Sequence, residues 1–242
     1  MSGVQLQLPE LFDEFAQRGS FEEESYAQGF KCVAGLDEVG RGPLAGPVVA
    51  AAVIMPRGFL SPDIKDSKLL TSSRREALAP VIKQNAVSWG LGVVQVEEID
   101  RFNILTASFL AMVQAYQTLL PAADCILIDG NQMIPPELFG LGKAAAGFLP
   151  RQRAIIKGDR LCISIAAASI VAKVARDAIM AELDKNYPEY GFASHKGYGC
   201  AAHLEALQRF GPSPFHRRSF KPVRDVCEEQ VRSDAGSLFS QR

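Results

Sequence analysis

The sequence predicts an α/β fold, a mixed sheet flanked by helices with a small helical part at the C-terminal end. Short apolar runs bounded by glycine and proline alternate with longer segments whose apolar residues recur at helical spacing. No segment repeats, so strands and helices interleave, as they do when helices pack on a sheet. With 242 residues, 48% of them hydrophobic, the chain can bury one large core.

The predicted strands are short apolar runs that end at glycine, proline or an acid. The clearest is Val48 to Ile54, seven consecutive apolar residues after a bend rich in glycine and proline. Strands are expected at about 31–38, 46–55 and 87–95, followed by one that ends at Asp129 and one that ends at Lys157.

Each predicted helix has one apolar face. In the segment 104–119 that face consists of Leu105, Phe109, Met112 and Tyr116. Other helices are expected at 72–84, in an alanine-rich segment ending near Lys185, and after Gly199. An amphipathic lead-in is expected from Pro9 to about Ala27, with Leu11, Phe12 and Phe15 as its apolar stripe.

Three of the predicted strands end in acids. Asp37 and Glu38 follow one apolar run, Asp129 follows the run 125–128, and Asp159 follows the run 154–156. Carboxylate oxygens suit hard divalent cations such as magnesium, and a pair of such ions can stabilise both the entering and the leaving oxygen of a phosphodiester. The pattern therefore favours metal-assisted phosphoryl chemistry over a structural ion.

Asp37 and Glu38 are neighbours, which limits how they can share an ion. Adjacent residues of a strand point to opposite faces of the sheet. Either the strand ends and twists at this point, or one of the two acids acts through a second ion or through a water.

A glycine-rich turn, Gly40, Arg41 and Gly42, directly follows these acids. Glycine lets the backbone approach a ligand closely and direct its N–H groups at an anion, and Arg41 adds a planar set of donors. The sequence thus predicts a phosphate-binding backbone beside a metal site.

Seven motifs, in the same order, resemble the type 2 ribonuclease H family, ribonuclease HII. They are GLDEVGRGPLAGPVVAAAV at 35–53, KDSKLL at 65–70, ILIDGN at 126–131, IKGD at 156–159, SIAAASIVAKVARD at 164–177, YGFASHKGYG at 190–199 and HRRSF at 216–220. The resemblance covers roughly residues 31–225, nearly the whole predicted fold.

The resemblance implies a ribonuclease H-like fold and an endonuclease that hydrolyses the RNA strand of RNA–DNA hybrids. It also implies incision on the 5′ side of single ribonucleotides embedded in duplex DNA, the first step of ribonucleotide excision repair, leaving 3′-hydroxyl and 5′-phosphate ends. The chain is expected to divide into a helical lead-in (1–30), a catalytic domain (31–198), a helical substrate-binding part (199–232) and a disordered polar tail (233–242).

Carried over position by position, the resemblance makes Asp37, Glu38, Asp129 and Asp159 the catalytic acids and metal ligands. The cofactor is expected to be magnesium or manganese, with two ions when substrate is bound. Asp177 competes for the fourth place. Because its segment has helical spacing, Asp177 is expected to pair with a neighbouring base instead.

In the same way, Gly40, Arg41 and Gly42 are expected to read the ribose 2′-hydroxyl and adjoining phosphates through backbone groups. Tyr198 is expected to stack on the next sugar downstream. Gly199 and Cys200 depart from the proline and threonine that many relatives carry there, which predicts a loop of altered stiffness.

Basic residues are concentrated in the C-terminal half, although the formal net charge is -1. Residues 151–224 hold thirteen Lys and Arg against six Asp and Glu, whereas the first 30 residues hold six acids and one arginine. This asymmetry is typical of a duplex binder. The residues expected near phosphates are Lys68 and Lys157 foremost, then Lys65, Lys173, Lys196, Arg217 and Arg218, with His195 and His216 in support and His203 structural.

The five cysteines are widely spaced and form no CxxC motif, which indicates free thiols in a reducing compartment. No apolar stretch reaches membrane length. The expected protein is a cytoplasmic monomer whose partners are RNA–DNA hybrid and ribonucleotide-containing DNA duplex.

Four other functions remain open on the sequence. Another nuclease or recombinase can use the same scaffold, and a ribonuclease can be confined to long hybrids. A catalytically inactive hybrid-binding module is disfavoured because all four acids are present. A small-molecule phosphatase is disfavoured because it needs no distributed basic surface.

Overall fold

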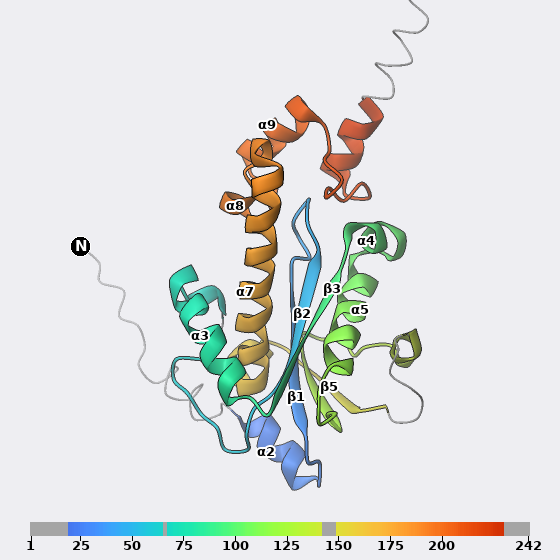
Figure 1. Cartoon of the computed structure of the whole chain (residues 1–242). Helices are drawn as coiled ribbons and strands as arrows, with labels where there is room; N and C mark the ends of the chain where they lie inside the picture. Colours follow the sequence, from blue (N-terminus) through green and yellow to red (C-terminus); the bar gives the residue numbers. More distant parts are fainter. Residues whose placement is uncertain (1–18, 65–66, 142–148, 230–242) are drawn as a thin grey trace, which may run out of the picture.

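The computed structural model describes residues 19–64, 67–141 and 149–229. At its centre is a five-stranded sheet in the order β3-β2-β1-β4-β5 (Figure 1). The strands are β1 (Val33–Val39), β2 (Val48–Ile54), β3 (Ser88–Val94), β4 (Cys125–Asp129) and β5 (Arg151–Ile155). β1 pairs antiparallel with β2, and β2 with β3, whereas β1 with β4 and β4 with β5 are parallel. The predicted mixed sheet is therefore confirmed.

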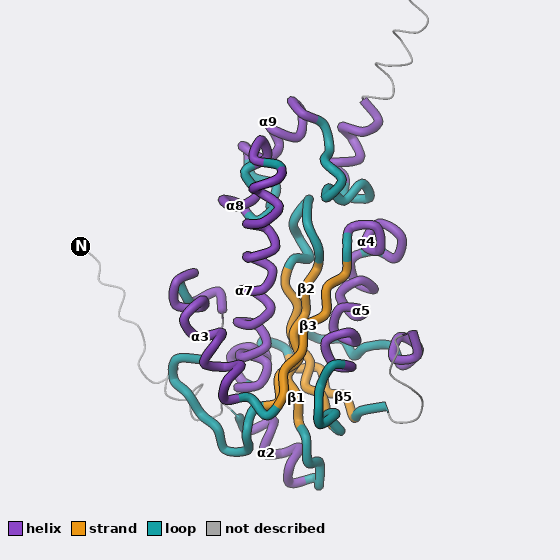
Figure 2. Tube along the Cα trace, viewed as in Figure 1, coloured by secondary structure: helices purple, strands orange, loops and turns teal. Residues whose placement is uncertain are grey.

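Helices lie on both sides of this sheet (Figure 2). They are α2 (Ser20–Ala27), α3 (Ser72–Asn85), α4 (Val96–Phe102), α5 (Ile104–Gln117), α6 (Gly158–Leu161), α7 (Ile163–Asn186), α8 (Phe192–His195) and α9 (Ala201–Phe210). Short 3-10 turns cover Ser67–Leu69, Pro136–Leu141 and Pro188–Tyr190, and residues 221–229 are helical. Within the described residues, no helix combines the length and apolar character that crossing a membrane requires.

The core has two layers because strand residues alternate between the faces of the sheet. Ala34 and Leu36 of β1 pack with α5 on one face. Val33 of the same strand packs with Ile165 of α7 on the other face. β2 is buried along its whole length, as a continuous apolar run predicts for a strand covered on both sides.

Gly35 is the point at which α7 crosses β1. A Cβ at this position would lie 2.2 Å from the backbone carbon of Ser164, so only glycine permits the approach. Glu22 of α2 accepts hydrogen bonds from the backbone N–H (3.0 Å) and hydroxyl (2.6 Å) of Ser164, which satisfies a free donor of the first turn of α7. The start of the long helix is thereby fixed two residues along β1 from Asp37.

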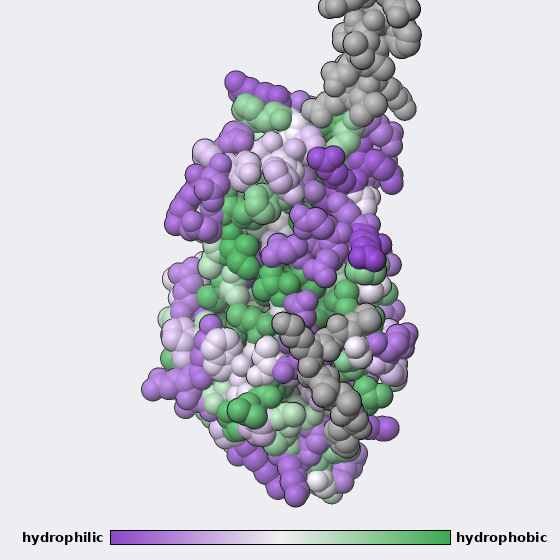
Figure 3. All heavy atoms as spheres, turned by 45° about the vertical axis from the view of Figure 1, so that its right-hand side comes forward, coloured by the Kyte–Doolittle hydropathy of each residue, from purple (hydrophilic) through white to green (hydrophobic). Residues whose placement is uncertain are grey.

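The loop that follows β1 packs against the C-terminal part of the chain. Leu44 contacts the cluster that includes Leu207 and Val223, and Ala45 contacts Met180 and Phe192. Figure 3 shows that the end of the molecule above the sheet is largely hydrophilic, with apolar side chains concentrated lower on the same face.

Most predicted elements agree with the structure to within a few residues, and α9 confirms the helix expected after Gly199. The sequence interpretation missed α4, a two-turn helix separated from α5 by Asn103, whose φ is 71° and whose side chain caps α5. The predicted stripe of Leu11, Phe12 and Phe15 and the tail 233–242 lie outside the described residues.

Candidate active site

Asp37 and Asp129 lie side by side on neighbouring parallel strands. Leu36 of β1 is in register with Ile128 of β4, so the next residue of each strand is an aspartate. Asp37 faces α7, where Ser169 donates a hydrogen bond to its carboxylate, and the alternation of β4 directs Asp129 to the same face. Two acids that are 92 positions apart in sequence thus meet at one edge of the sheet.

Asp159 joins them from the first turn of α6, which follows β5. Its side chain is buried. The preceding residue, Gly158, donates its N–H to Asp129 Oδ1 at 2.8 Å. Lys157 has a left-handed conformation (φ 59°) that turns the chain from β5 into this helix. Asp159 is therefore carried to the ends of β1 and β4 by a tight turn.

Glu38 points to the opposite face of the sheet, as its position next to Asp37 requires. β1 continues to Val39, so the strand does not end at these acids. Glu38 lines an open recess of about 130 Å³ with Asp129 and residues of α5. Its carboxylate lies 3.2 Å from the guanidinium of Arg41.

The acids of this site repel one another. Burial raises the pKa of Asp37 well above its ordinary value, and the charges of Glu38, Asp129 and Asp159 raise it further, against the hydrogen bond from Ser169. Burial also raises the pKa of Glu38, and Asp129 adds to this, while Arg41 lowers it. A cation bound among these carboxylates would favour their ionised forms.

As they stand, these carboxylates do not close around a single ion. No group of three or more His, Cys, Asp or Glu side chains in the described part of the chain is arranged to hold a metal. Existing hydrogen bonds account for this, because Asp129 is held by Gly158, Glu38 by Arg41, and Asp37 by the N–H of Glu38 (2.8 Å). The donor set still fits hard divalent cations, since it offers only carboxylate oxygens under mutual repulsion.

Lys68 Nζ lies 3.6 Å from Asp159 Oδ2, and its side chain is 80% exposed. It lies in the 3-10 turn Ser67–Leu69, whose carbonyls at Ser67 and Leu70 accept hydrogen bonds from Arg75. Ser67 Oγ lies 2.8 Å from Ser169 Oγ, the residue that also bonds Asp37. A hydrogen-bonded chain therefore links the loop of Lys68 to the carboxylates. Lys157 is exposed and lies two residues before Asp159 in sequence.

The turn Gly40, Arg41 and Gly42 is next to Tyr198. A Cβ on Gly42 would lie 3.6 Å from Cε1 of the Tyr198 ring, and that ring is 47% exposed. Arg41 and Gly42 are also exposed, whereas Gly40 is buried. The structure thus brings the predicted turn and the predicted stacking residue together, beyond the β1 end that carries Glu38.

Two of the predicted phosphate contacts, those of Arg217 and His216, are wrong. Arg217 has no exposed surface, and His216 is 1% exposed, so neither can meet a phosphate. Lys173 forms an ion pair with Asp177 at 2.8 Å, which confirms the expectation that Asp177 pairs with a base. Lys196 donates to the carbonyl of Ala193. Arg218 is exposed, and Lys65 lies outside the described residues.

His203 and His216 form a buried, hydrogen-bonded pair instead. His203 Nδ1 bonds the carbonyl of Tyr198 at 2.9 Å, and its Nε2 lies 3.0 Å from His216 Nε2. Burial lowers the pKa of both rings, that of His216 to about 3. The structural role expected for His203 is confirmed, and His216 shares it.

Sequence reasoning also missed a pair of buried arginines, Arg176 and Arg217, beneath the turn 40–47. Their side chains bond backbone carbonyls of that turn. The only signal in the sequence is that each lies in one of the ordered motifs.

Comparisons with known proteins agree with this geometry. The model of the family described as "Ribonuclease HII" matches residues 34–223. Ribonuclease HII of Ruminiclostridium cellulolyticum is 49% identical over 83% of this chain and 74% of its own length, and that of Geobacter sulfurreducens is 49% identical over 90% and 96%. Among solved structures, ribonuclease H2 from Pyrococcus horikoshii OT3 matches with a TM-score of 0.67 and 29% identity over 84% of this chain and 99% of that chain.

Proposed function

This chain belongs to the ribonuclease HII family, and from that premise we propose that it cuts at a ribonucleotide within a duplex. As a member of the family it is an endoribonuclease. The proposed activity is hydrolysis of the RNA strand of RNA–DNA hybrids and incision 5′ of single ribonucleotides in duplex DNA. The observation that carries it is the adjacency of two features: the carboxylates at the ends of β1 and β4, of which Asp37 is buried and Asp129 partly buried, and the turn 40–42 beside Tyr198.

Asp37, Glu38, Asp129 and Asp159 would hold divalent cations, magnesium or manganese, two of them when substrate is bound. Bound there, such ions supply the activation of a water for in-line attack and the neutralisation of charge on the departing 3′ oxygen. The charges of the site support this placement of the cations. Asp37 is buried among like charges, so a cation relieves the repulsion that raises its pKa.

Other residues would position the substrate. Ser169 orients the carboxylate of Asp37 through its hydrogen bond. Lys68, beside Asp159, and the exposed Lys157 would meet phosphates, and the exposed amino group of Lys68 can leave Asp159 when a cation binds there.

Recognition of the ribonucleotide would fall to the turn and to Tyr198. Backbone groups of Gly40, Arg41 and Gly42 can donate to and accept from a 2′-hydroxyl, the atom that distinguishes RNA from DNA. The exposed ring of Tyr198, in contact distance of Gly42, would stack on the adjoining sugar. Products would carry 3′-hydroxyl and 5′-phosphate ends.

The histidines have no part in proton transfer in this proposal. His203 and His216 are buried and bonded to one another, to Tyr198 and to Ser213. No covalent intermediate is needed when a water attacks directly.

The organisation proposed from the sequence is a catalytic domain at 31–198 and a substrate-binding part at 199–232, acting as a monomer in the cytoplasm. All five cysteines are free, which supports a reducing compartment. The partners proposed are RNA–DNA hybrid and DNA duplex containing ribonucleotides.

The test is cleavage of a DNA duplex that bears one embedded ribonucleotide, with the product ends mapped, with and without magnesium. Metal-dependent cleavage on the 5′ side of the ribonucleotide, leaving a 3′-hydroxyl, is expected. Tight binding without a metal-dependent cut would instead identify an inactive hybrid-binding module. Cleavage of long hybrids alone would remove single-ribonucleotide incision from the proposal.

A further inference from the structure

Arg217 is fully buried and bonds three backbone carbonyls of the turn after β1. Its Nη2 donates to the carbonyl of Gly40 at 2.6 Å and its Nη1 to that of Arg41 at 2.9 Å. Nε and Nη2 also donate to the carbonyl of Gly46, at 3.0 and 2.8 Å. Its own N–H donates to the carbonyl of Leu44 at 2.8 Å. A residue 171 or more positions away in sequence therefore determines how this turn is held.

These bonds fix the direction of two successive peptide planes. A trans peptide is planar, and its N–H points opposite to its C=O. Because the carbonyls of Gly40 and Arg41 point at Arg217, the N–H groups of Arg41 and Gly42 point away from it. Neither N–H donates to another group in the described part of the chain, and both residues are exposed. Two adjacent amide donors thus face the surface next to Tyr198.

We propose that Arg217 is a positioning residue for recognition of the ribonucleotide: by holding the carbonyls of Gly40 and Arg41 it directs the N–H groups of Arg41 and Gly42 at a substrate oxygen. Successive backbone N–H groups that point the same way form a concave anion site. This inference rests on the proposed function and assigns to a buried side chain the orientation of the groups that read the substrate.

The local backbone supports this role for Arg217. Gly40 has φ 97°, a left-handed conformation that needs an external restraint to be the single state of a flexible turn. No carboxylate in residues 19–64, 67–141 and 149–229 forms an ion pair with Arg217, so its donors are committed to the turn. The ring of Phe220 lies 5.1 Å from the guanidinium and limits its movement.

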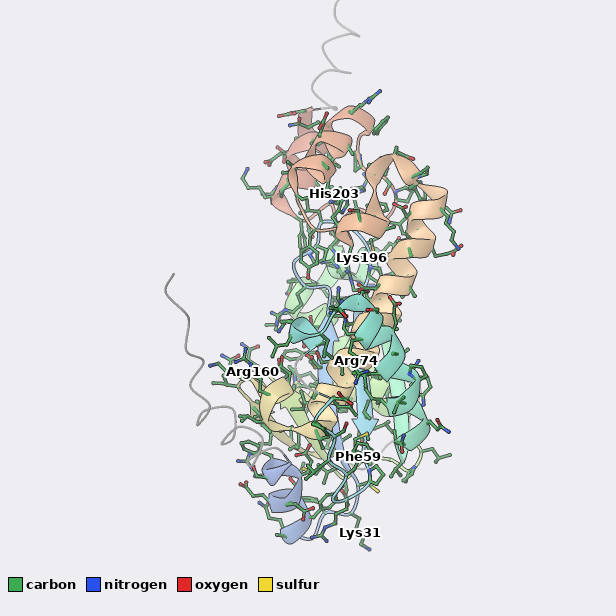
Figure 4. The ribbon with its side chains drawn as sticks, turned by 90° about the vertical axis from the view of Figure 1, so that its left-hand side faces the viewer. Lys31, Phe59, Arg74, Arg160, Lys196 and His203 are labelled. Carbon is green, nitrogen blue, oxygen red and sulfur yellow. The ribbon has the colours of Figure 1, made fainter. Side chains whose placement is uncertain are left out.

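The charge on Arg217 persists at neutral pH. Burial lowers its pKa to about 9, and the nearby charge of Arg176 contributes, while Asp100 and Tyr198 act in the opposite direction. Arg176 completes the arrangement by bonding the carbonyls of Pro47 (3.0 Å), Ala45 (3.2 Å) and Lys196 (3.0 Å). That last bond ties the turn to the loop of Tyr198. Figure 4 shows Lys196 and His203 together in this end of the molecule.

The experiment compares two constants of the active protein. The first is kcat/KM for a duplex with one ribonucleotide. The second is the inhibition constant of an all-DNA duplex of the same sequence, which measures binding of the duplex without recognition of a ribose. Arg217→Lys keeps the charge but presents its donors from a single nitrogen, without the planar fork whose Nε, Nη1 and Nη2 reach the carbonyls of Gly46, Arg41 and Gly40. Phe220→Leu, which keeps Arg217 and loosens it, is the second variant in case Arg217→Lys does not fold.

For Arg217→Lys, kcat/KM on the single-ribonucleotide duplex is expected to fall by about tenfold or more, the equivalent of a hydrogen bond or two. The inhibition constant of the all-DNA duplex should stay within about twofold, and Phe220→Leu should show the same pattern with a smaller fall. The matched control is Ile82→Ala, a buried residue of α3 whose core cluster is separate from those that contain Leu44 and Ala45 of the turn, and which should lower stability without touching the turn. It should leave the ratio of the two constants unchanged.

Two results would overturn the inference. One is a parallel change of both constants, which indicates general loss of fold. The other is unchanged ribose preference in both variants. Failure of the wild-type protein to cleave the ribonucleotide duplex would overturn the proposed function itself, and this inference with it, before any variant is compared.

Discussion

The two ends of the candidate site carry opposite charges and differ in how those charges are held. At the sheet, four carboxylates approach one another, and the cations beside them are Arg41 on Glu38 and Lys68 on Asp159. Beyond the sheet, two buried guanidiniums lie beneath the turn 40–47, and no carboxylate of the described residues forms an ion pair with either.

The difference lies in how much hydrogen-bonding capacity remains. Arg217 and Arg176 donate their hydrogen bonds to backbone carbonyls of this chain, so these guanidinium groups fix the conformation of the turn 40–47. A carboxylate can accept several hydrogen bonds or bind a cation. At the acidic end, the neighbouring carboxylates also raise the pKa of Asp37 by repulsion. The acidic end therefore has the character of a ligand site, and the arginine end that of a scaffold.

The largest expected effect is at the carboxylate end. Asp129→Asn is expected to reduce the cleavage rate by at least about 10²-fold, because the site loses a charge that it needs in the transition state. Affinity for the duplex should be kept, since the basic residues are untouched. Melting of the metal-free protein should move to higher temperature, because one cause of the repulsion on Asp37 is gone.

Rate, affinity and melting temperature without added metal separate the outcomes for this variant. Retained turnover would remove Asp129 from the site. A lower melting temperature would mean that its bond to the N–H of Gly158 outweighs the repulsion.

A second variant pair tests which carboxylate is the fourth ligand. Asp159→Asn is expected to lower metal-dependent turnover by about 10²-fold. Asp177→Asn should stay within about twofold of wild type, because Asp177 is already paired with Lys173. The measurement is the turnover of each variant across a magnesium titration. A larger loss of turnover in Asp177→Asn than in Asp159→Asn would make Asp177 the ligand instead.

Tyr198 lies beside the turn, with its ring 3.6 Å from where a Cβ of Gly42 would be, and its carbonyl accepts a hydrogen bond from His203. Tyr198→Ala should lower incision at a single ribonucleotide by about tenfold, the usual value of one stacking contact. Tyr198→Phe is the matched control and should keep most of the rate. Equal rates for all three proteins on that substrate would reject the stacking role.

The carboxylate end and the arginine end also differ in how far the sequence alone predicts them. Strands that end in acids are local patterns, and parallel register then brings Asp37 and Asp129 together without further information. The opposite directions of Asp37 and Glu38 also follow from alternation along one strand. The sheet and the meeting of its acids were therefore predictable.

The arginine end was not predictable, because burial there depends on contacts between distant segments. Arg217 and Arg218 are adjacent and chemically identical, yet one is buried and the other exposed. The difference comes from the antiparallel bridge between Ala45 and His216, which directs Arg217 under the turn. No local pattern carries that information, so the charge count assigned Arg217 to phosphates incorrectly.

The smallest expected effect is a pH dependence of stability at the arginine end. His203 Nδ1–H donates to a carbonyl, so its Nε2 accepts from His216, whose Nδ1 accepts from the N–H of Ser213. A proton on His216 breaks this chain, which agrees with a folded pKa of about 3 against 6.5 for the free ring. The unfolded chain therefore takes up the proton first, and stability falls as pH drops below 6.5, by about 2 kcal/mol at pH 5.

The raised pKa of Asp37 has the opposite effect on stability as pH falls, so wild type must be compared with His216→Gln. The free energy of unfolding of both proteins is measured by urea denaturation at pH 7 and at pH 5. The variant should lose less stability between the two pH values, and equal losses would show that this ring does not protonate on unfolding.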